Sequence, residues 1–149
     1  MAPIRVTDVV QVCVVVRDLD ASVRTYYDDY GIGPWAIYAF NPETVDDLRQ
    51  GGEPVETAWR LAIAQVGSMM WELIQPLDDR STYARFLAEH GEGVHHVAVG
   101  VDSFENATAA ARNRGMAWRI WSSGPNRYSA MIANPVTVLR SSETCDGTT

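Results

Sequence analysis

The sequence predicts an α+β fold in which two paired β-α-β-β-β modules form a cleft between curved mixed sheets. The first observation is an internal repeat, because the apolar segment 9–16 matches the segment 94–101 at a constant shift of 85 residues, from Val9 to Val94. The second is that a helical pattern follows each segment, and the third is that short strand patterns follow each helix. Because each half alone is too small to bury a sufficient core, we expect the two sheets to pair about a pseudo-twofold axis.

In the first half, the apolar strand 9–16 precedes a helix that begins near Asp18 and ends at Gly31. Acidic residues favour the first turn of a helix, and glycine is a common stop signal. Val23, Tyr26 and Tyr30 lie at helical spacing and predict one buried face. Three further strands are expected at 35–40, 57–66 and 69–75.

A connecting helix is expected at 81–90, where Ser81 provides the start and Gly91 the stop. The second half repeats the order, with strands at 94–101, 117–121, 127–133 and 136–141 and a helix that ends at Gly115. The expected organisation is one domain over residues 1–149, with a first module at about 6–77 and a second module at about 93–142.

Composition and charge exclude several classes of function. The 149-residue chain has a formal net charge of −7, and all 12 basic residues are arginine, so nucleic-acid and membrane-surface partners are not expected. The absence of lysine excludes Schiff-base, pyridoxal phosphate and P-loop chemistry. The apolar segment 9–16 is too short to span a membrane, and the N-terminus lacks a signal-peptide pattern, so a cytoplasmic protein is expected. Cys13 is expected to be a small buried hydrophobe.

Three motifs of this chain resemble the vicinal oxygen chelate superfamily. They are VVQV at 9–12 with RDL at 17–19, WELIQPL at 71–77, and GVHHVA at 93–98. Within the superfamily, the chain is most similar to methylmalonyl-CoA epimerase and glyoxalase-type members. The resemblance covers about residues 6–134 and implies a fold of paired modules with the active site in the cleft.

The resemblance also implies a divalent metal (Co, Mn, Ni, Mg or Zn) bound by one residue from the first and one from the last strand of each module. The matching positions are Gln11, Glu72, His96 and a residue near Arg140. The usual occupants are His, Glu or Gln, His, and Glu, so Gln11 and Arg140 depart from the pattern. Glutamine is a neutral ligand and arginine repels a cation, so we expect weak or no metal binding. Glu143 is an alternative fourth ligand only if the strand ends or bulges.

The roles of the candidate catalytic residues are left open between two interpretations. Glu72 either binds metal or forms a buried ion pair with Arg140. His96 is expected to act as an acid or a metal ligand, while period-two alternation places His95 on the other face of the strand. Glu56 matches the position of the proton-abstracting carboxylate in methylmalonyl-CoA epimerase, and a solvated glutamate is the competing interpretation.

Aromatic residues suggest where a substrate would bind. Trp35, Tyr38, Trp59 and Trp121 could shape an aromatic pocket, with Arg140 as a further substrate contact. The leading hypothesis is an epimerase, isomerase or lyase that acts by proton transfer next to a carbonyl of a small metabolite. The alternative is a metal-free small-molecule binding protein that resembles bleomycin-resistance proteins. A homodimer is expected in either case.

Overall fold

The computed structural model describes residues 4–43, 49–50, 53–54, 56–114, 118–122 and 128–133. The elements, in chain order, are β1 (Val6–Val15), α1 (Leu19–Tyr30), β2 (Ala36–Phe40), β3 (Arg49–Gln50), β4 (Glu53–Pro54), β5 (Trp59–Val66), β6 (Met69–Pro76), α2 (Thr82–His90), β7 (Gly93–Val101), α3 (Phe104–Asn113), β8 (Trp118–Ser122) and β9 (Tyr128–Ala133).

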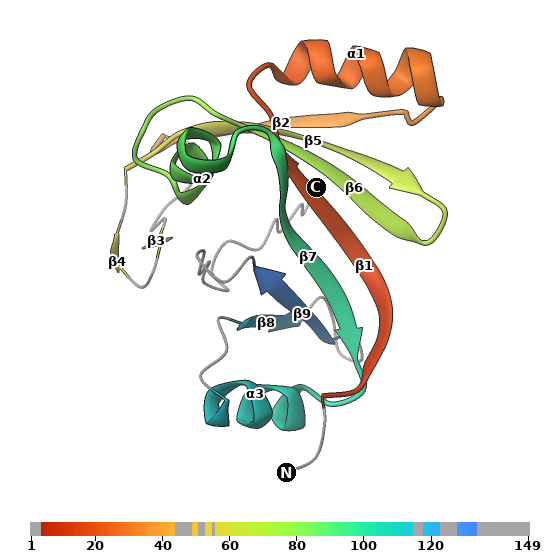
Figure 1. The fold of residues 1–149 in the computed structure, drawn as a ribbon, viewed down its shortest axis with the longest axis vertical. Coiled ribbons are helices and arrows are strands. Elements are labelled where there is room, and N and C mark those ends of the chain that lie inside the picture. The colour runs from red at the N-terminus through yellow and green to blue at the C-terminus, as the bar shows by residue number, and fades with distance from the viewer. Residues whose placement is uncertain are drawn as a thin grey trace.

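Seven of the strands form one curved mixed sheet in the order β2-β5-β6-β1-β7-β9-β8, while β3 and β4 pair separately (Figure 1). β1 pairs in parallel with β6 and antiparallel with β7, so the first strands of the two modules lie side by side. This confirms the predicted α+β fold class.

The two modules differ in how their strands are ordered. In the first module β6 lies between β1 and β5, whereas β9 pairs directly with β7 in the second. The strand predicted at 136–141 lies outside the described residues. Within the described part, the second module therefore does not repeat the strand order of the first.

Local capping signals explain where the helices begin and end. The Asp18 side chain accepts a hydrogen bond from the backbone N–H of Ala21 (2.9 Å), which satisfies one of the free donors at the start of α1. Gly31 ends α1 with φ 67°, a left-handed conformation that glycine adopts at little cost. Ser81 caps α2 through Ala84, as the sequence predicts. α3 ends at Asn113 with Arg114 as its C-cap, and Gly115, where the sequence predicts the stop, lies outside the described residues.

Helices α1 and α2 pack against opposite faces of the first module's sheet. The face under α1 is apolar and includes Val14, Val16 and Leu73, which pack with Leu19. The opposite face packs against α2 and is also largely apolar. Its buried cluster comprises Cys13, Val15, Trp59, Leu61, Ile74, Tyr83 and Phe86. Burial of these faces supplies the main driving force for folding of the module.

α3 packs beside β8 and β9 at the far end of the second module (Figure 1). A small cluster of Val99, Val101 and Ala107 joins this helix to β7. Among the described residues, no helix is both long enough and apolar enough to cross a membrane.

Candidate functional site

Two buried polar side chains meet on the α2-facing side of the sheet, where β1 and β6 pair. Glu72 on β6 is 5% exposed, and Gln11 on β1 is 8% exposed. The Gln11 amide nitrogen donates a hydrogen bond to Oε2 of Glu72 at 2.5 Å. Because a buried carboxylate without partners is costly, this contact both orients Glu72 and offsets part of its desolvation.

His96 on β7 brings a third polar group to the same place. Its Nε2 lies 3.7 Å from Oε2 of Glu72, and its side chain is buried. In the register of the sheet, Cys13 on β1 pairs with both Glu72 and His96, which explains why the three side chains share one face. The site therefore forms where β6, β1 and β7 run side by side.

An irregularity in β7 changes the position of His95. Cys13 pairs with His96, but Val14 pairs with Val94, so His95 is an extra residue in β7, a β-bulge. Its Nδ1 lies 2.9 Å from Nδ1 of His96, and its ring packs against Tyr83 of α2. The prediction that His95 faces away from His96 is wrong, because the bulge breaks the period-two alternation on which it rested.

Burial controls the protonation of these groups. Desolvation raises the pKa of Glu72 to about 7, although hydrogen bonds from Cys13 and Gln11 act in the opposite direction. Desolvation, assisted by His95, lowers the pKa of His96 to about 3, and burial lowers that of His95 to about 4. His96 is therefore a neutral imidazole, although it lies close to Glu72, and the carboxyl group of Glu72 titrates near neutral pH. This combination is suited to proton transfer.

Comparison with known proteins gives the family. Residues 10–130 match the model of the Glyoxalase/Bleomycin resistance protein/Dioxygenase superfamily, which is the vicinal oxygen chelate superfamily. The chain belongs to this superfamily. The resemblance of its sequence motifs is thereby confirmed. No curated protein matches the chain.

Solved structures similar to this vicinal oxygen chelate protein include several methylmalonyl-CoA epimerases. One from Mycobacterium tuberculosis has a TM-score of 0.59 at 24% identity, covering 87% of this chain and 81% of the other. A Streptomyces coelicolor variant in complex with 2-nitronate-propionyl-CoA has a TM-score of 0.57 at 27% identity, covering 76% of each chain. An epimerase in complex with methylmalonyl-CoA and NH4+ has a TM-score of 0.60 at 25% identity, covering 91% of this chain and 92% of the other.

The family's metal positions can now be tested against the geometry. Glu72 and His96 fit, because the carboxylate and the imidazole Nε2 are close together and Nε2 has no hydrogen-bond partner among the described residues. The amide nitrogen of Gln11 donates to Glu72, so only its Oε1 atom is left as a neutral ligand for a cation. Arg140 and Glu143 lie outside the described residues, so neither the predicted ion pair nor the alternative ligand is seen.

The predicted relation between Gln11 and His96 requires a correction. They do not face one another across a cleft, because β1 and β7 are neighbouring strands and Gln11 pairs with Ala98. Both side chains instead contact Oε2 of Glu72, Gln11 from the neighbouring strand β1 and His96 from β7 beyond it. The internal repeat, with its shift of 85 residues, identified Gln11 and His96 as equivalent positions. Because β1 and β7 are neighbours, these two positions lie diagonally across from each other within one sheet.

The structure separates Glu56 from this site. Glu56 is exposed and lies before β5, whereas Glu72 pairs with Ile63. The segment 56–63 connects Glu56 to Ile63, the partner of Glu72. At about 3.3 Å per residue, an extended segment of this length spans on the order of 20 Å. Its role as a base stays a prediction.

The three aromatic residues of the predicted pocket whose side chains the structure describes do not gather around Glu72. Trp35 packs on the α1 face with Tyr26, Trp59 is a core residue stacked on Phe40, and Tyr38 is 48% exposed on β2. The side chain of Trp121, on β8, lies outside the described part of the chain.

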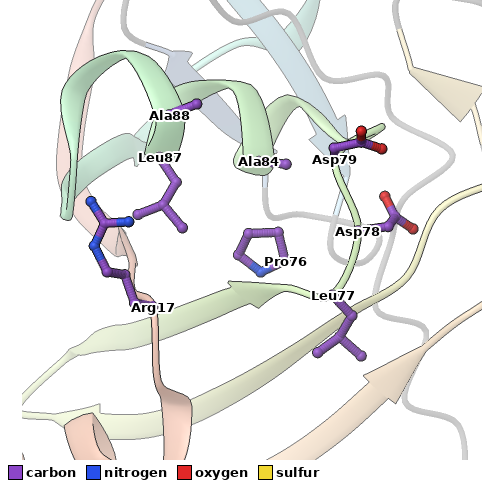
Figure 2. A pocket seen from close by; sticks show the side chains of 8 residues that line it. All are labelled: Arg17, Pro76, Leu77, Asp78, Asp79, Ala84, Leu87 and Ala88. Atoms are coloured by element: carbon purple, nitrogen blue, oxygen red, sulfur yellow. The ribbon is translucent and has the colours of Figure 1, made fainter.

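A cavity of about 350 Å³ lies between one side of α2 and the segment 76–79 (Figure 2). Its lining includes Arg17, Leu77 and Leu87, and none of the predicted site residues.

Sequence reasoning treated Cys13 as a core residue only, and its burial at 0% exposure confirms that it is a core residue. It missed the proximity of Cys13 to both histidines, because nothing in the local sequence marks the bulge at His95.

Proposed function

We propose that this protein is an epimerase or isomerase that moves a proton on the carbon beside a carbonyl group of a small-molecule substrate. The observation that carries the proposal is the buried contact of Glu72 with Gln11 and His96, three polar groups on one sheet face. The similarity to methylmalonyl-CoA epimerases, two of them solved with CoA thioesters, supports this class of chemistry.

Glu72 is the proposed general base. Its carboxylate takes the proton from the carbon, and the electron pair of the C–H bond moves to the carbonyl oxygen to give an enolate. Gln11 holds the carboxylate through its amide N–H, which fixes the direction of proton transfer. The protonated Glu72 then returns the proton to the carbon, which restores the carboxylate, and return to the opposite face of the enolate inverts the configuration. Glu72 is well suited because its pKa of about 7 lets it exist in both forms near neutral pH.

His96 is proposed to orient Glu72 and to hydrogen-bond to the substrate. With its pKa lowered by burial, its imidazole is neutral and can donate a hydrogen bond from one ring nitrogen. A divalent metal bound by Glu72 and His96 would supply Lewis-acid stabilisation of the enolate oxygen. A lyase reaction would begin with the same proton removal.

The substrate is proposed to be a CoA thioester or a smaller keto or cyclic metabolite. The thioester is supported by the ligands of the similar structures. The smaller metabolite is supported by the net charge of −7, which does not favour a polyanionic CoA tail.

The test is deuterium incorporation from D2O into methylmalonyl-CoA and into a small keto acid, followed by mass spectrometry. We expect exchange by the wild type and a loss of about 10² to 10⁴ in rate for Glu72→Gln. Glu89→Gln, at an exposed position of α2, is the matched control and should keep the wild-type rate. A loss in Glu56→Gln with no loss in Glu72→Gln would instead assign the base to Glu56.

A metal-free binding protein is the second candidate. One observation favours it: Gln11 already provides Glu72 with a neutral hydrogen-bond partner, so the carboxylate does not require a cation. This candidate predicts saturable binding of a planar aromatic ligand with no exchange of carbon-bound protons in any substrate.

We further propose a cytoplasmic homodimer of single-domain chains. Its support is a set of exposed apolar side chains on α1 and β2, at the edge of the sheet. These residues are Tyr27, Tyr30, Ile37 and Tyr38. Light scattering should give twice the chain mass of 16.5 kDa, and a mass of 16.5 kDa at micromolar concentration would contradict the dimer.

A further inference from the structure

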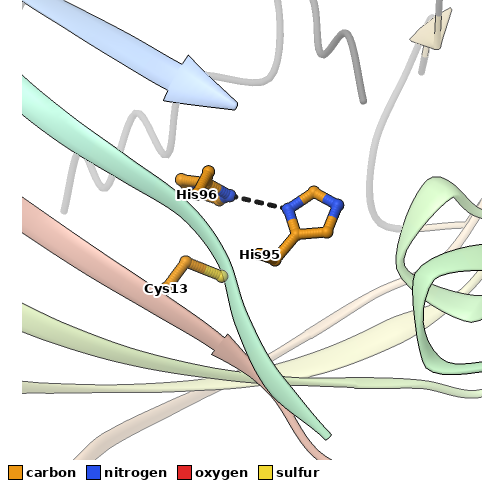
Figure 3. A group of neighbouring side chains, drawn as sticks. All are labelled: Cys13, His95 and His96. Carbon is orange, nitrogen blue, oxygen red and sulfur yellow. Dashed lines mark hydrogen bonds between the residues drawn. The ribbon is translucent and has the colours of Figure 1, made fainter. Parts of the chain in front are cut away.

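Three metal-ligating side chains from the two modules converge beside the proposed active site. Cys13 belongs to β1 of the first module, and His95 and His96 belong to β7 of the second. One ligand atom from each residue lies within 4.8 Å of the others, and all three residues are buried (Figure 3). The Cys13 side chain lies next to β7, near the two imidazole rings.

A second observation indicates that these histidines are not fully satisfied as core residues. Their Nδ1 atoms face each other at 2.9 Å. The Nε2 atom of each ring is buried and has no hydrogen-bond partner among the described residues. Buried polar atoms are normally paired, so two unpaired imidazole nitrogens at one place require an explanation.

We propose that Cys13, His95 and His96 bind a borderline transition-metal ion such as Zn²⁺ or Co²⁺, which joins the first strands of the two modules. Thiolate and imidazole ligands favour these ions over Mg²⁺ or Ca²⁺, which require oxygen. Bonds of about 2.0–2.1 Å to nitrogen and about 2.3 Å to sulfur separate the ligand atoms of a tetrahedral zinc site by roughly 3.3–3.6 Å. The donor atoms of the three side chains lie within 4.8 Å of one another, which is close to that spacing.

Glu72 completes the surroundings of this Cys13–His95–His96 site. A histidine that binds metal through one nitrogen usually presents the other to a carboxylate. In His96 the Nδ1 atom faces His95, and the Nε2 atom lies on the side of Glu72, 3.7 Å from its Oε2, where the carboxylate could accept a hydrogen bond from the ring when Nδ1 binds a metal. The Cys13 thiol loses its proton on binding, and the thiolate and the Glu72 carboxylate together balance the charge of a dication.

This donor set shares only His96 with the four metal positions implied by the family. Cys13 and His95 are new ligands, and Gln11 and Arg140 are not ligands. Glu72 faces His96 instead of binding the metal. The proposed site explains why a bulge brings His95 onto the same face as His96. It does not depend on the proposed reaction, because binding would join the modules whether or not Glu72 moves a proton.

The experiment is titration of the chelator-treated full chain with Co²⁺, in a Cys145→Ala background so that Cys13 is the only thiol. The wild-type site should give one equivalent of bound cobalt with a thiolate-to-cobalt charge-transfer band in the near ultraviolet. The unfolding midpoint should rise with added Zn²⁺. Cys13→Ala should abolish the band, and His95→Phe, which suits the aromatic contacts with Tyr83 and Phe86, should weaken binding by more than about 100-fold.

His90→Ala is the matched control, because His90 is a half-exposed histidine of α2 and should leave the band and the affinity unchanged. Gln11→Leu should also retain the band. Circular dichroism of each variant, together with unfolding midpoints without metal, shows that folding is preserved. Cobalt bound without a charge-transfer band and weakened by Gln11→Leu would overturn the proposal, as would the absence of bound cobalt.

Discussion

The two faces of the first module's sheet have different chemistry, although the same strands supply both. The face under α1 carries apolar side chains such as Val14 and Leu73. One residue away along the same strands, the α2-facing side carries Cys13 and Glu72. Alternate positions along one strand therefore belong to different functions: one set of side chains stabilises the fold, and the other set forms the candidate site. A change on the α1 face should alter folding, and a change on the other face should alter the site.

The largest expected effect on stability belongs to the α1 face. Leu73 is completely buried there, so Leu73→Ala leaves a cavity and should lower the free energy of unfolding by about 2–5 kcal/mol. Chemical denaturation monitored by circular dichroism measures the loss. A change below about 1 kcal/mol would show that the site collapses around the smaller side chain.

The second prediction concerns how the free energy of unfolding depends on pH, measured on protein that a chelator keeps free of metal. Burial holds the pKa of Glu72 at about 7, above its ordinary value of 4.5. The folded state therefore binds more protons than the unfolded state between these values, and stability falls as pH rises through this range. Glu72→Gln removes this contribution, so its stability relative to wild type should increase by up to about 3 kcal/mol from pH 4.5 to 7.

The histidines act in the opposite direction. Burial lowers the pKa of His95 to about 4 and that of His96 to about 3, so the unfolded state binds more protons below its ordinary pKa of 6.5. Their contribution is fully present above pH 6.5 and is lost progressively as pH falls toward 4 and 3. His95→Phe should therefore reduce the acid sensitivity of the metal-free protein. An unchanged dependence of unfolding free energy on pH would contradict the burial of His95.

The smallest effect lies at the start of α1, away from both faces. Asp18→Ala removes the side-chain hydrogen bond to Ala21 and should cost about 1 kcal/mol of unfolding free energy. Asp28→Ala, at an exposed position of α1, is a control and should change stability by less than about 0.5 kcal/mol. Equal effects of the two substitutions would argue against capping as the cause.

The parts of the fold that depend on local signals were predictable from the sequence. Asp18, Gly31, Ser81 and Gly91 mark the ends of α1 and α2 because capping involves only nearby residues. The internal repeat likewise identified Gln11 and His96 as equivalent positions. These features require no knowledge of how strands pair.

The composition of the site was less predictable, because it depends on strand register. One extra residue in β7 turns His95 toward His96, and a bulge of this kind has no signal in a single sequence. The number of residues between Glu56 and Glu72 also does not reveal that Glu72 pairs with Ile63, in the middle of β5, while Glu56 lies before that strand begins. Long-range pairing decided both outcomes.

The most direct measurement of the account compares two adjacent residues on opposite faces, Glu72 and Leu73. Deuterium exchange into a substrate's carbonyl-adjacent position is measured for Glu72→Gln and Leu73→Ala, with each rate normalised to the folded fraction. Glu72→Gln should lose about 10² to 10⁴ in rate, while Leu73→Ala should keep the wild-type rate per folded molecule. Wild-type exchange by Glu72→Gln, or an equal loss in both variants, would contradict the assignment of chemistry to the Glu72 face.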